Sequence, residues 1–223
     1  MNEWTLFTLI MLFLWLIVYA AKPGVRREML YVSIYSAPFG FLEPLFVPRY
    51  WNPPSLFDLA GTTGFDLESI VYCFATGGIA SVLYEVFFSA RHVKAPGENP
   101  LKNPQALAVA SPFAFFILLL LTGMNPIYAS SISMSAGVAL VLVFRPDLMK
   151  KIIVGGFLFL LLYFAYFQLF DLTFPGAVQR MWNLTHLSGI LLAGVPLEEL
   201  AYAAAFGMLW SSAYEYIKQY RLF

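Results

Sequence analysis

Apolar residues gather in seven long stretches of the chain, and the short segments between them hold most of the charged residues. Each stretch approaches the roughly 20 residues that a helix needs to cross a bilayer core of about 30 Å. The pattern therefore predicts an all-α integral membrane protein with seven transmembrane helices. The expected spans are Thr5–Ala21, Met29–Val47, Leu67–Phe88, Ala106–Leu121, Ile127–Phe144, Ile152–Phe170 and Ile190–Tyr216.

Lysines and arginines are unevenly distributed between the segments that join these spans. Eleven of the 13 fall in the first, third and fifth loops and in the C-terminal tail, whereas Arg49 and Arg180 lie on the other side. The positive-inside rule then places the N-terminus outside and the C-terminus inside. We expect a multi-pass protein of the cell membrane, which is the inner or plasma membrane in a prokaryote.

Part of the third span is repeated in the seventh. Gly64–Arg91 and Gly194–Arg221 align without a gap, and ten of the 28 positions are identical. An R-x-W-N motif precedes each copy, with Trp51 in the first and Trp182 in the second. Spans one to three thus correspond to spans five to seven. Because a single span joins them, both units enter the membrane in the same direction, which predicts two parallel three-helix repeats in a 3+1+3 arrangement.

The chain is expected to form a single membrane domain. Its parts are the first repeat at residues 1–91, the connecting helix and its loops at 92–126, and the second repeat at 127–223. Small residues such as the aligned Gly77 and Gly207 predict close helix packing in the third and seventh spans. The repeated Glu85 and Glu215 lie about 25 Å along the helix from Glu68 and Glu198, the first glutamates of the two copies. We expect them to be anchors that snorkel to the inner interface.

Composition and charge exclude several classes of protein. Hydrophobic residues make up 60% of the chain and charged residues 12%, a balance that a soluble surface could not sustain. The net charge is zero, so membrane lipids and not nucleic acids are the expected partners. A lone Cys73 excludes a disulfide framework and a thiolate metal cluster. Without a phosphate-binding loop or an HExxH motif, no cofactor and no metal is expected.

The repeated acids are the main candidates for chemistry. Glu68 and Glu198 begin the third and seventh spans, Glu199 follows directly, and Tyr72 and Tyr202 lie one helical turn further on the same face. Acidic residues within a membrane are costly and are commonly functional. In a dry pocket such a carboxyl group keeps its proton and can act as a general acid. The alternative interpretation is that these acids are only the polar starts of two helices.

Other residues on the same outer side extend this candidate site. Glu43 ends the second span and Asp171 the sixth, and Arg49 and Arg180 could balance them in ordinary ion pairs. Aromatic residues make up 18% of the chain, and their faces can stabilise a carbocation. An aromatic belt at the membrane interface explains many of them. The matched tryptophans are expected to line the pocket. The aromatic residues that crowd the sixth span are Tyr163, Phe164, Tyr166, Phe167 and Phe170.

The run Pro196-Leu197-Glu198-Glu199, followed by Tyr202, resembles the P-x-E-E motif of the membrane-embedded lycopene β-cyclases. These include a heterodimeric bacterial type and fused archaeal and fungal types, and the 3+1+3 plan fits the fused form. The first copy departs from the motif, because it reads Asp66-Leu67-Glu68-Ser69. The first unit can therefore be structural, and the substrate need not be lycopene.

The resemblance implies a cofactor-independent carotenoid cyclase, an isomerase of the intramolecular lyase class. It would form ionone-type end rings on lycopene or a related polyene by acid-initiated carbocation cyclisation, and other carotenoid enzymes are candidate partners. Glu198 or Glu199 would donate the proton, the other would hold or recover it, and Glu68 would be their counterpart in the first unit. The substrate-binding candidates are Tyr72, Tyr202, Trp51, Trp182, Glu43 and Asp171.

Three other interpretations have sequence features that test them. A 3+1+3 transporter for a small solute would carry polar groups at the midplane, whereas these acids lie toward one face. A retinal-binding protein needs a lysine in the middle of the seventh span, and Lys218 lies at its inner end. A non-catalytic carotenoid-binding or isoprenoid-binding membrane protein would show the same apolar pocket, so this alternative stays open.

Overall fold

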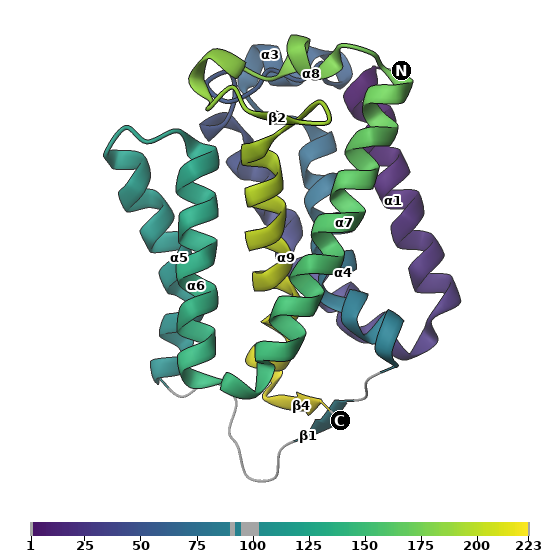
Figure 1. Cartoon of the computed structure of the whole chain (residues 1–223), viewed down its shortest axis with the longest axis vertical. Coiled ribbons are helices and arrows are strands. Elements are labelled where there is room, and N and C mark those ends of the chain that lie inside the picture. The colour runs from purple at the N-terminus through teal and green to yellow at the C-terminus, as the bar shows by residue number, and fades with distance from the viewer. Residues whose placement is uncertain (1, 90–91, 95–102, 223) are drawn as a thin grey trace.

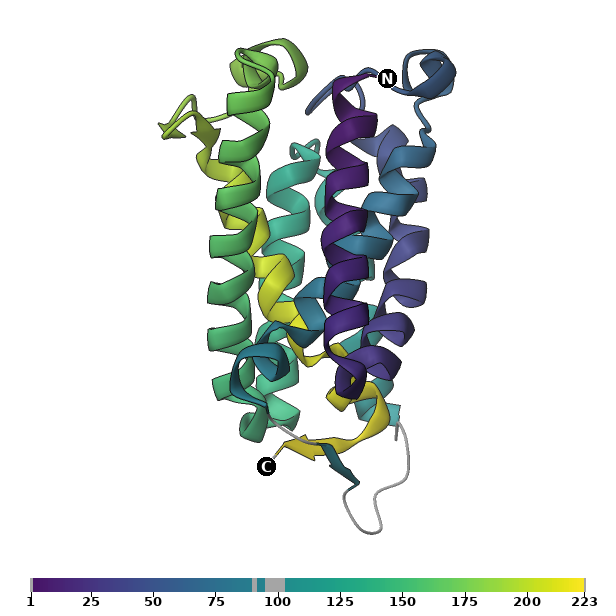
Figure 2. The ribbon, with the colours of Figure 1, turned by 90° about the vertical axis from the view of Figure 1, so that its right-hand side faces the viewer.

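The computed structural model describes residues 2–89, 92–94 and 103–222. The chain forms a bundle of long helices that run from one end of the molecule to the other (Figure 1). The N-terminus lies at one end and the C-terminus at the other (Figure 2). Following the predicted orientation, we call these the outer and the inner end. The long helices are α1 (Glu3–Ala21), α2 (Arg26–Ser36), α4 (Leu67–Phe88), α5 (Asn103–Leu121), α6 (Pro126–Phe144), α7 (Met149–Thr173) and α9 (Leu197–Lys218).

Short elements cover the two ends of the bundle. The outer end holds η3 (Leu56–Asp58), α3 (Leu59–Thr63), α8 (Ala177–Met181), η5 (Leu184–His186) and the hairpin of β2 (Leu191–Leu192) and β3 (Val195–Pro196). The inner end holds η1 (Pro23–Val25), η4 (Pro146–Leu148) and the antiparallel pair of β1 (His92–Lys94) and β4 (Tyr220–Leu222). Arg91 and Lys102, which contribute to the predicted orientation, lie outside the described residues.

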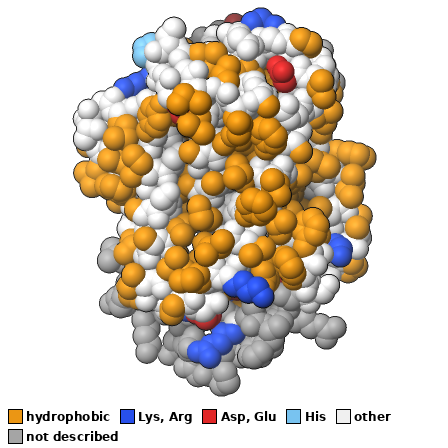
Figure 3. All heavy atoms as spheres, viewed as in Figure 1, with side chains coloured by type: hydrophobic (Ala, Val, Ile, Leu, Met, Phe, Trp, Pro, Cys, Tyr) orange, Lys and Arg blue, Asp and Glu red, His pale blue; other side chains and the backbone are white. Residues whose placement is uncertain are grey.

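Apolar side chains cover most of the face of the bundle shown in Figure 3, and the charged side chains visible there lie mainly toward its two ends. Exposed residues such as Phe13 and Ile153 would be unfavourable in water but suit a lipid environment. Among the described residues, four segments are long and apolar enough to cross a bilayer: α1, α4, α6 and Pro146–Thr173. The all-α membrane class fits these findings. The count of seven spans and the 3+1+3 arrangement stay predictions.

A helix occupies part of each predicted stretch, but the second stretch is not one continuous α-helix. α2 ends at Ser36, and the chain continues as the 3₁₀ helix η2 (Ala37–Leu45). Pro38 and Pro44 explain this break, because proline lacks the N–H group that an α-helix needs in its interior. The predicted single helix over Met29–Val47 is therefore wrong in its continuity.

The seventh predicted stretch also begins later than expected. Its first residues form the β2–β3 hairpin, which turns through Ala193 and Gly194, both with positive φ. This conformation suits glycine and cannot continue a right-handed helix. α9 therefore starts at Leu197 rather than at Ile190, and Glu198 and Glu199 fall in its first turn.

α4 and α9, which carry the two aligned segments, each pack against several neighbours. α4 contacts α1, α2, η2 and α7, α9 contacts α6 and α7, α4 and α9 touch each other, and α5 packs on α6. A methyl group added to Gly77 would collide with Ser36 of α2, and one added to Gly207 would lie 2.7 Å from the Cβ of Phe159 on α7. The aligned glycines thus allow each helix to approach a neighbour closely.

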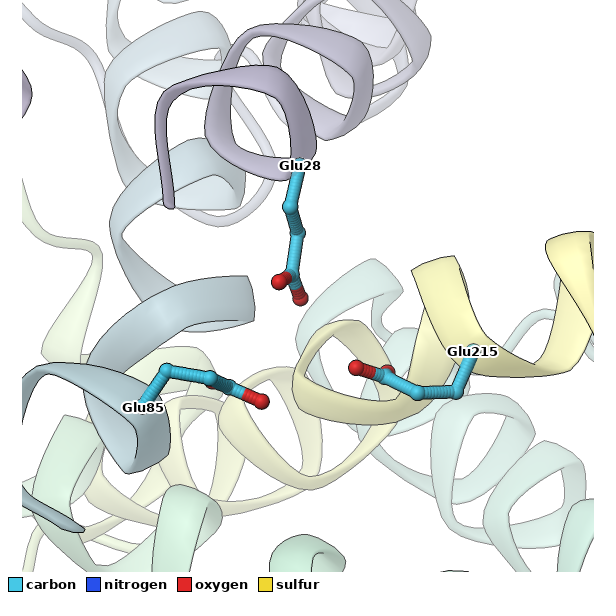
Figure 4. Close-up of side chains that lie close together, drawn as sticks. All are labelled: Glu28, Glu85 and Glu215. Carbon is cyan, nitrogen blue, oxygen red and sulfur yellow. The ribbon is translucent and has the colours of Figure 1, made fainter. Parts of the chain in front are cut away.

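The expected interfacial anchors Glu85 and Glu215 are instead buried inside the bundle. Together with Glu28 of α2 they converge from three helices (Figure 4). The Nζ atom of Lys151 on α7 lies 3.1 Å from Glu28 and 2.6 Å from each of Glu85 and Glu215. The carboxylate oxygens lie within 4.8 Å of one another, a spacing that a metal ion would accept, but the lysine nitrogen already contacts all three. The expectation that they snorkel is wrong, because their partner lies in the interior.

Replacing Lys151 with methionine should lower the free energy of unfolding by on the order of 3 kcal/mol, because it removes the ammonium group from three buried carboxylates. The neighbouring Lys150 is exposed, so Lys150→Met is a matched control and should change stability by less than about 0.5 kcal/mol. Unfolding in detergent measures both variants. Equal stability of Lys151→Met and the unmodified protein would contradict this role of the cluster.

Candidate active site

A cavity of about 380 Å³ lies between α4, α9 and η2, and α5 and α6 contribute further walls. Tyr50, Trp51 and Trp182 line it near the outer end. Most of the remaining lining is aromatic or aliphatic. Among the described residues that line it, the only carboxylates are Glu43 of η2 and Glu199 of α9.

Glu199 is 4% exposed and accepts hydrogen bonds from three neutral groups. The hydroxyl of Tyr163 donates to Oε2 at 2.5 Å, and Nε1 of Trp182 donates to Oε1 at 2.7 Å. The hydroxyl of Tyr50 also donates to Oε1. No lysine or arginine within the described ranges forms an ion pair with Glu199. Both oxygens of this carboxyl group are therefore held without a cation.

Tyr50 belongs to the outer loop that follows η2. Burial raises the pKa of its hydroxyl well above the ordinary value, and the adjacent Glu199 raises it further. The hydroxyl thus stays protonated and can keep donating its hydrogen bond. It also accepts a hydrogen bond of 3.0 Å from Nε1 of Trp182. Tyr50 and Trp182 therefore form one connected network with Glu199.

The two R-x-W-N motifs pair with each other across the outer end of the cavity. Trp51 and Trp182 form an isolated antiparallel bridge, in which the N–H of Asn52 donates to the carbonyl of Met181 at 2.7 Å and that of Asn183 to Tyr50 at 2.9 Å. The two indole rings lie 5.2 Å apart, centroid to centroid. This bridge holds Tyr50 and both tryptophans against the cavity. The matched motifs had predicted this position for the tryptophans but not for Tyr50.

Glu43 is 8% exposed and accepts a hydrogen bond of 2.7 Å from Nε1 of Trp51. The expected ion pairs of Glu43 and Asp171 with the outer arginines are wrong. Arg49 donates to the carbonyl of Gly123, and Arg180 pairs with Glu3 at 2.6 Å. Both arginines are exposed at the outer end, Arg49 in the loop after η2 and Arg180 in α8.

Glu68 and Glu198 lie outside the cavity lining. Oε1 of Glu68 accepts from the Thr5 hydroxyl at 2.5 Å and from the backbone N–H of Leu56 at 2.8 Å. Oε1 of Glu198 likewise accepts from the Tyr128 hydroxyl at 2.6 Å and from the backbone N–H of Ser188 at 2.7 Å. Each of these acids thus ties the start of its helix to an outer loop and to a neighbouring helix.

Successive residues of an α-helix point about 100° apart, which separates the two acids of the P-x-E-E motif. Glu198 faces α6 and the loop, whereas Glu199 faces the cavity. Tyr72 and Tyr202 both line the cavity, where Tyr72 packs on Trp4 and Tyr202 on Phe206. Asp171 is half-buried beside Gly194 and is not part of the lining.

The lycopene cyclase family model matches residues 125–217, from the start of α6 to the last turn of α9. The match supports a relationship of this segment to the lycopene cyclase family. The segment contains Glu199, Tyr163, Trp182 and Tyr202, and the match confirms the family resemblance that the P-x-E-E motif indicated. No curated protein and no solved structure matches the chain.

Two of the hydrogen-bond donors to Glu199, the hydroxyl groups of Tyr50 and Tyr163, were not predicted from the sequence. Tyr50 lies outside the matched segment and is brought to Glu199 by the tryptophan bridge, although its place inside the first R-x-W-N motif was a usable signal. Tyr163 is one of several aromatic residues of the sixth span, and nothing in the local sequence separates it from its neighbours. Its hydrogen bond depends on how α7 packs on α9.

The structural roles of Glu68 and Glu198 can be tested with one alanine variant of each. Glu68→Ala leaves the buried Thr5 hydroxyl and the N–H of Leu56 without their acceptor, so it should lower the free energy of unfolding by about 1–3 kcal/mol. Glu198→Ala frees the hydroxyl of Tyr128 and the N–H of Ser188, both of which are exposed and can bind water, so its effect should be smaller, about 0.5–1.5 kcal/mol. Thermal unfolding in detergent provides the measurement. Two variants as stable as the unmodified protein would show that these bonds do not hold the outer loops.

Proposed function

We propose that this chain is a cofactor-independent, membrane-embedded carotenoid cyclase of the lycopene β-cyclase type. The family match over residues 125–217 supports a lycopene cyclase-like function. The acid-initiated mechanism, the isomerase class, the ionone-type product and the fused seven-span architecture are the finer parts of the proposal. The multi-pass location in the cell membrane belongs to it as well.

The observation that carries the proposal is the setting of Glu199. A carboxyl group lies in an apolar, aromatic cavity, and its partners are the neutral donors Tyr50, Tyr163 and Trp182. An acid that is locked in an ion pair cannot readily exchange a proton, whereas one held by neutral donors can take part in proton transfer. Fixed donors around the site of a changing charge also stabilise that charge without reorganisation.

The shape of the cavity fits one end of a long polyene. Its lining follows α9 from Glu199 to Ile217, a distance of about 27 Å at the rise of an α-helix. Three lining residues, Tyr35, Phe39 and Phe113, are also exposed on the side of the bundle. An apolar substrate can thus enter from the lipid phase between η2 and α5 and reach the carboxyl groups with one end.

The residues of the cavity supply what the cyclisation requires. Protonation of the terminal double bond of an acyclic end produces a tertiary carbocation, which a second double bond of the same chain attacks to close a six-membered ring. Loss of a proton beside the new cation restores a double bond, so the net change is an isomerisation. The rings of Tyr72, Trp182 and Tyr202 line the space in which the cation forms and can stabilise it by cation–π interactions.

The alternatives fit the cavity less well. A transporter for a polar solute would line its site with many polar groups, but this lining is mostly apolar. A non-catalytic carotenoid binder would need the apolar walls, yet it would have no use for a buried carboxyl group held by three donors. Such a group is costly to bury and is better explained by proton transfer.

Expression in cells that accumulate lycopene tests the proposed function. The unmodified chain should convert lycopene into products with cyclic ends, and Glu199→Gln should lower their yield by about 100-fold or more, because general acid–base catalysis contributes roughly that much. Chromatography of extracted pigments measures the yield, scaled to the amount of folded protein.

Glu198→Gln is the matched control, since glutamine can still accept hydrogen bonds from Tyr128 and Ser188. This variant should retain most of the yield per folded protein. Full yield from Glu199→Gln would remove Glu199 from the mechanism. Unaltered lycopene bound to the unmodified chain would favour the non-catalytic binder.

A further inference from the structure

Resting on the proposed function, we propose that Glu43 and Glu199 act as an acid–base pair, in which Glu43 donates the proton that starts the cyclisation and Glu199 takes the proton that ends it. From the sequence, Glu43 is expected to bind the substrate, and the two glutamates of the P-x-E-E motif are expected to carry both proton transfers. The structure instead brings Glu43 and Glu199 to one cavity from different elements.

The two carboxyl groups have matching positions relative to the paired tryptophans. Nε1 of Trp51 donates to Glu43 at 2.7 Å, and Nε1 of Trp182 donates to Glu199 at the same distance. The tryptophans themselves lie side by side in the antiparallel bridge. Each indole N–H is thus directed at one acid of the cavity.

Glu43 lies beside the residue that replaces Glu199 in the first copy of the repeat. That residue is Ser69, which also lines the cavity. A methyl group added to Gly40 of η2 would lie 2.5 Å from the backbone of Ile70 at the start of α4, so η2 and α4 are in direct contact there. A 3₁₀ helix has three residues per turn, which places Glu43 on the same face as Gly40. η2 therefore supplies the carboxyl group that α4 lacks.

The surroundings of the two acids favour opposite roles. Glu199 receives three donors, which stabilise its negative form. Glu43 is also buried, but its hydrogen-bonding partners are fewer, namely the N–H of Trp51 and the side chain of Ser69, and no described lysine or arginine pairs with it. Burial without such compensation favours the neutral form, which is the one that can give a proton. Two acids with environments that differ in this way divide the acid and base roles between them.

Each of the two acids has its own titratable neighbours. Asp66, which caps α4, and Cys73 lie near Glu43, and burial raises the pKa of the Asp66 carboxyl group. Tyr50, Tyr163 and the neighbouring Glu198 surround Glu199. None of these groups around Glu43 is a cation; Ser69 and Trp51 favour its charged form, whereas burial and the nearby Asp66 favour its neutral form more strongly.

The proton balance of the reaction closes with this pair. The O–H bond of Glu43 breaks as a C–H bond forms at the terminal double bond, and the cation that results lies near the negative Glu199. After ring closure the carboxylate of Glu199 removes the proton beside the cation, and that C–H electron pair becomes the new double bond. Glu199 then holds one proton and Glu43 lacks one, so proton exchange through water resets the pair.

Aspartate variants test this assignment through the pH profile of kcat/KM with lycopene in lipid nanodiscs. The alkaline limb of the profile reports the essential acid and the acidic limb the essential base. Glu43→Asp should shift the alkaline limb alone, and Glu199→Asp the acidic limb alone. Glu43→Gln should reduce kcat/KM by about 100-fold or more. Glu3→Gln, at the same end of the bundle but outside this cavity, should leave the profile unchanged.

A Glu43→Asp profile that matches the unmodified protein would overturn the proposal, as would a shift confined to its acidic limb. A merely structural role of Glu43 would scale the whole profile without moving either limb, and this result would also overturn it. Failure of the unmodified protein to cyclise any acyclic carotenoid would instead remove the proposed function, and the acid–base assignment with it.

Discussion

The structure depends on how carboxyl groups are accommodated inside an apolar bundle. A buried charge is costly unless it is paired, hydrogen-bonded or neutralised by a proton. At the inner end, Glu28, Glu85 and Glu215 surround the ammonium group of Lys151, which fixes four helices together. At the cavity, Glu199 is held by two hydroxyl groups and an indole N–H instead. The first solution fixes the charges in place, whereas the second, as we propose, leaves the acid able to exchange a proton.

The two copies of the repeated sequence share a scaffold but differ in chemistry. The repeated Glu68 and Glu198 make equivalent hydrogen bonds, each to a hydroxyl of another helix and to a backbone N–H of an outer loop. The next position differs, since Ser69 in the first copy corresponds to Glu199 in the second. Glu43 comes from η2, outside the repeated segment. The repeated Glu68 and Glu198 thus serve the common framework, whereas the unrepeated Glu43 and Glu199 face the cavity.

Much of the fold follows from the sequence. A long apolar stretch in lipid forms a helix, because a helix satisfies the hydrogen bonds of its own backbone groups within one segment. The R-x-W-N motifs likewise indicated the cavity position of Trp51 and Trp182. The 3₁₀ segment η2 was missed even though Pro38 and Pro44 were visible, because the apolar pattern continues through them. The burial of Glu85 and Glu215 could not be foreseen, since it depends on Lys151 of a distant helix.

The candidate site was predictable only in part. The P-x-E-E motif indicated the turn of α9 that reaches the cavity, but which of Glu198 and Glu199 faces the cavity depends on a rotation of about 100° that only the packing of α9 fixes. Tyr50 reaches Glu199 across 149 positions of sequence through a loop, and no local pattern encodes such a contact. Sequence analysis therefore finds the helix that carries the acid more readily than the partners that control it.

Infrared spectroscopy of the purified protein in lipid tests most directly whether a neutral carboxyl group faces the cavity. The carbonyl band of a protonated carboxyl group shifts when H₂O is exchanged for D₂O. Near neutral pH, the unmodified protein should show such a band. The contribution of Glu43 to this band should disappear in Glu43→Gln and persist in Glu199→Gln. Identical spectra of Glu43→Gln and the unmodified protein in this region would contradict the account.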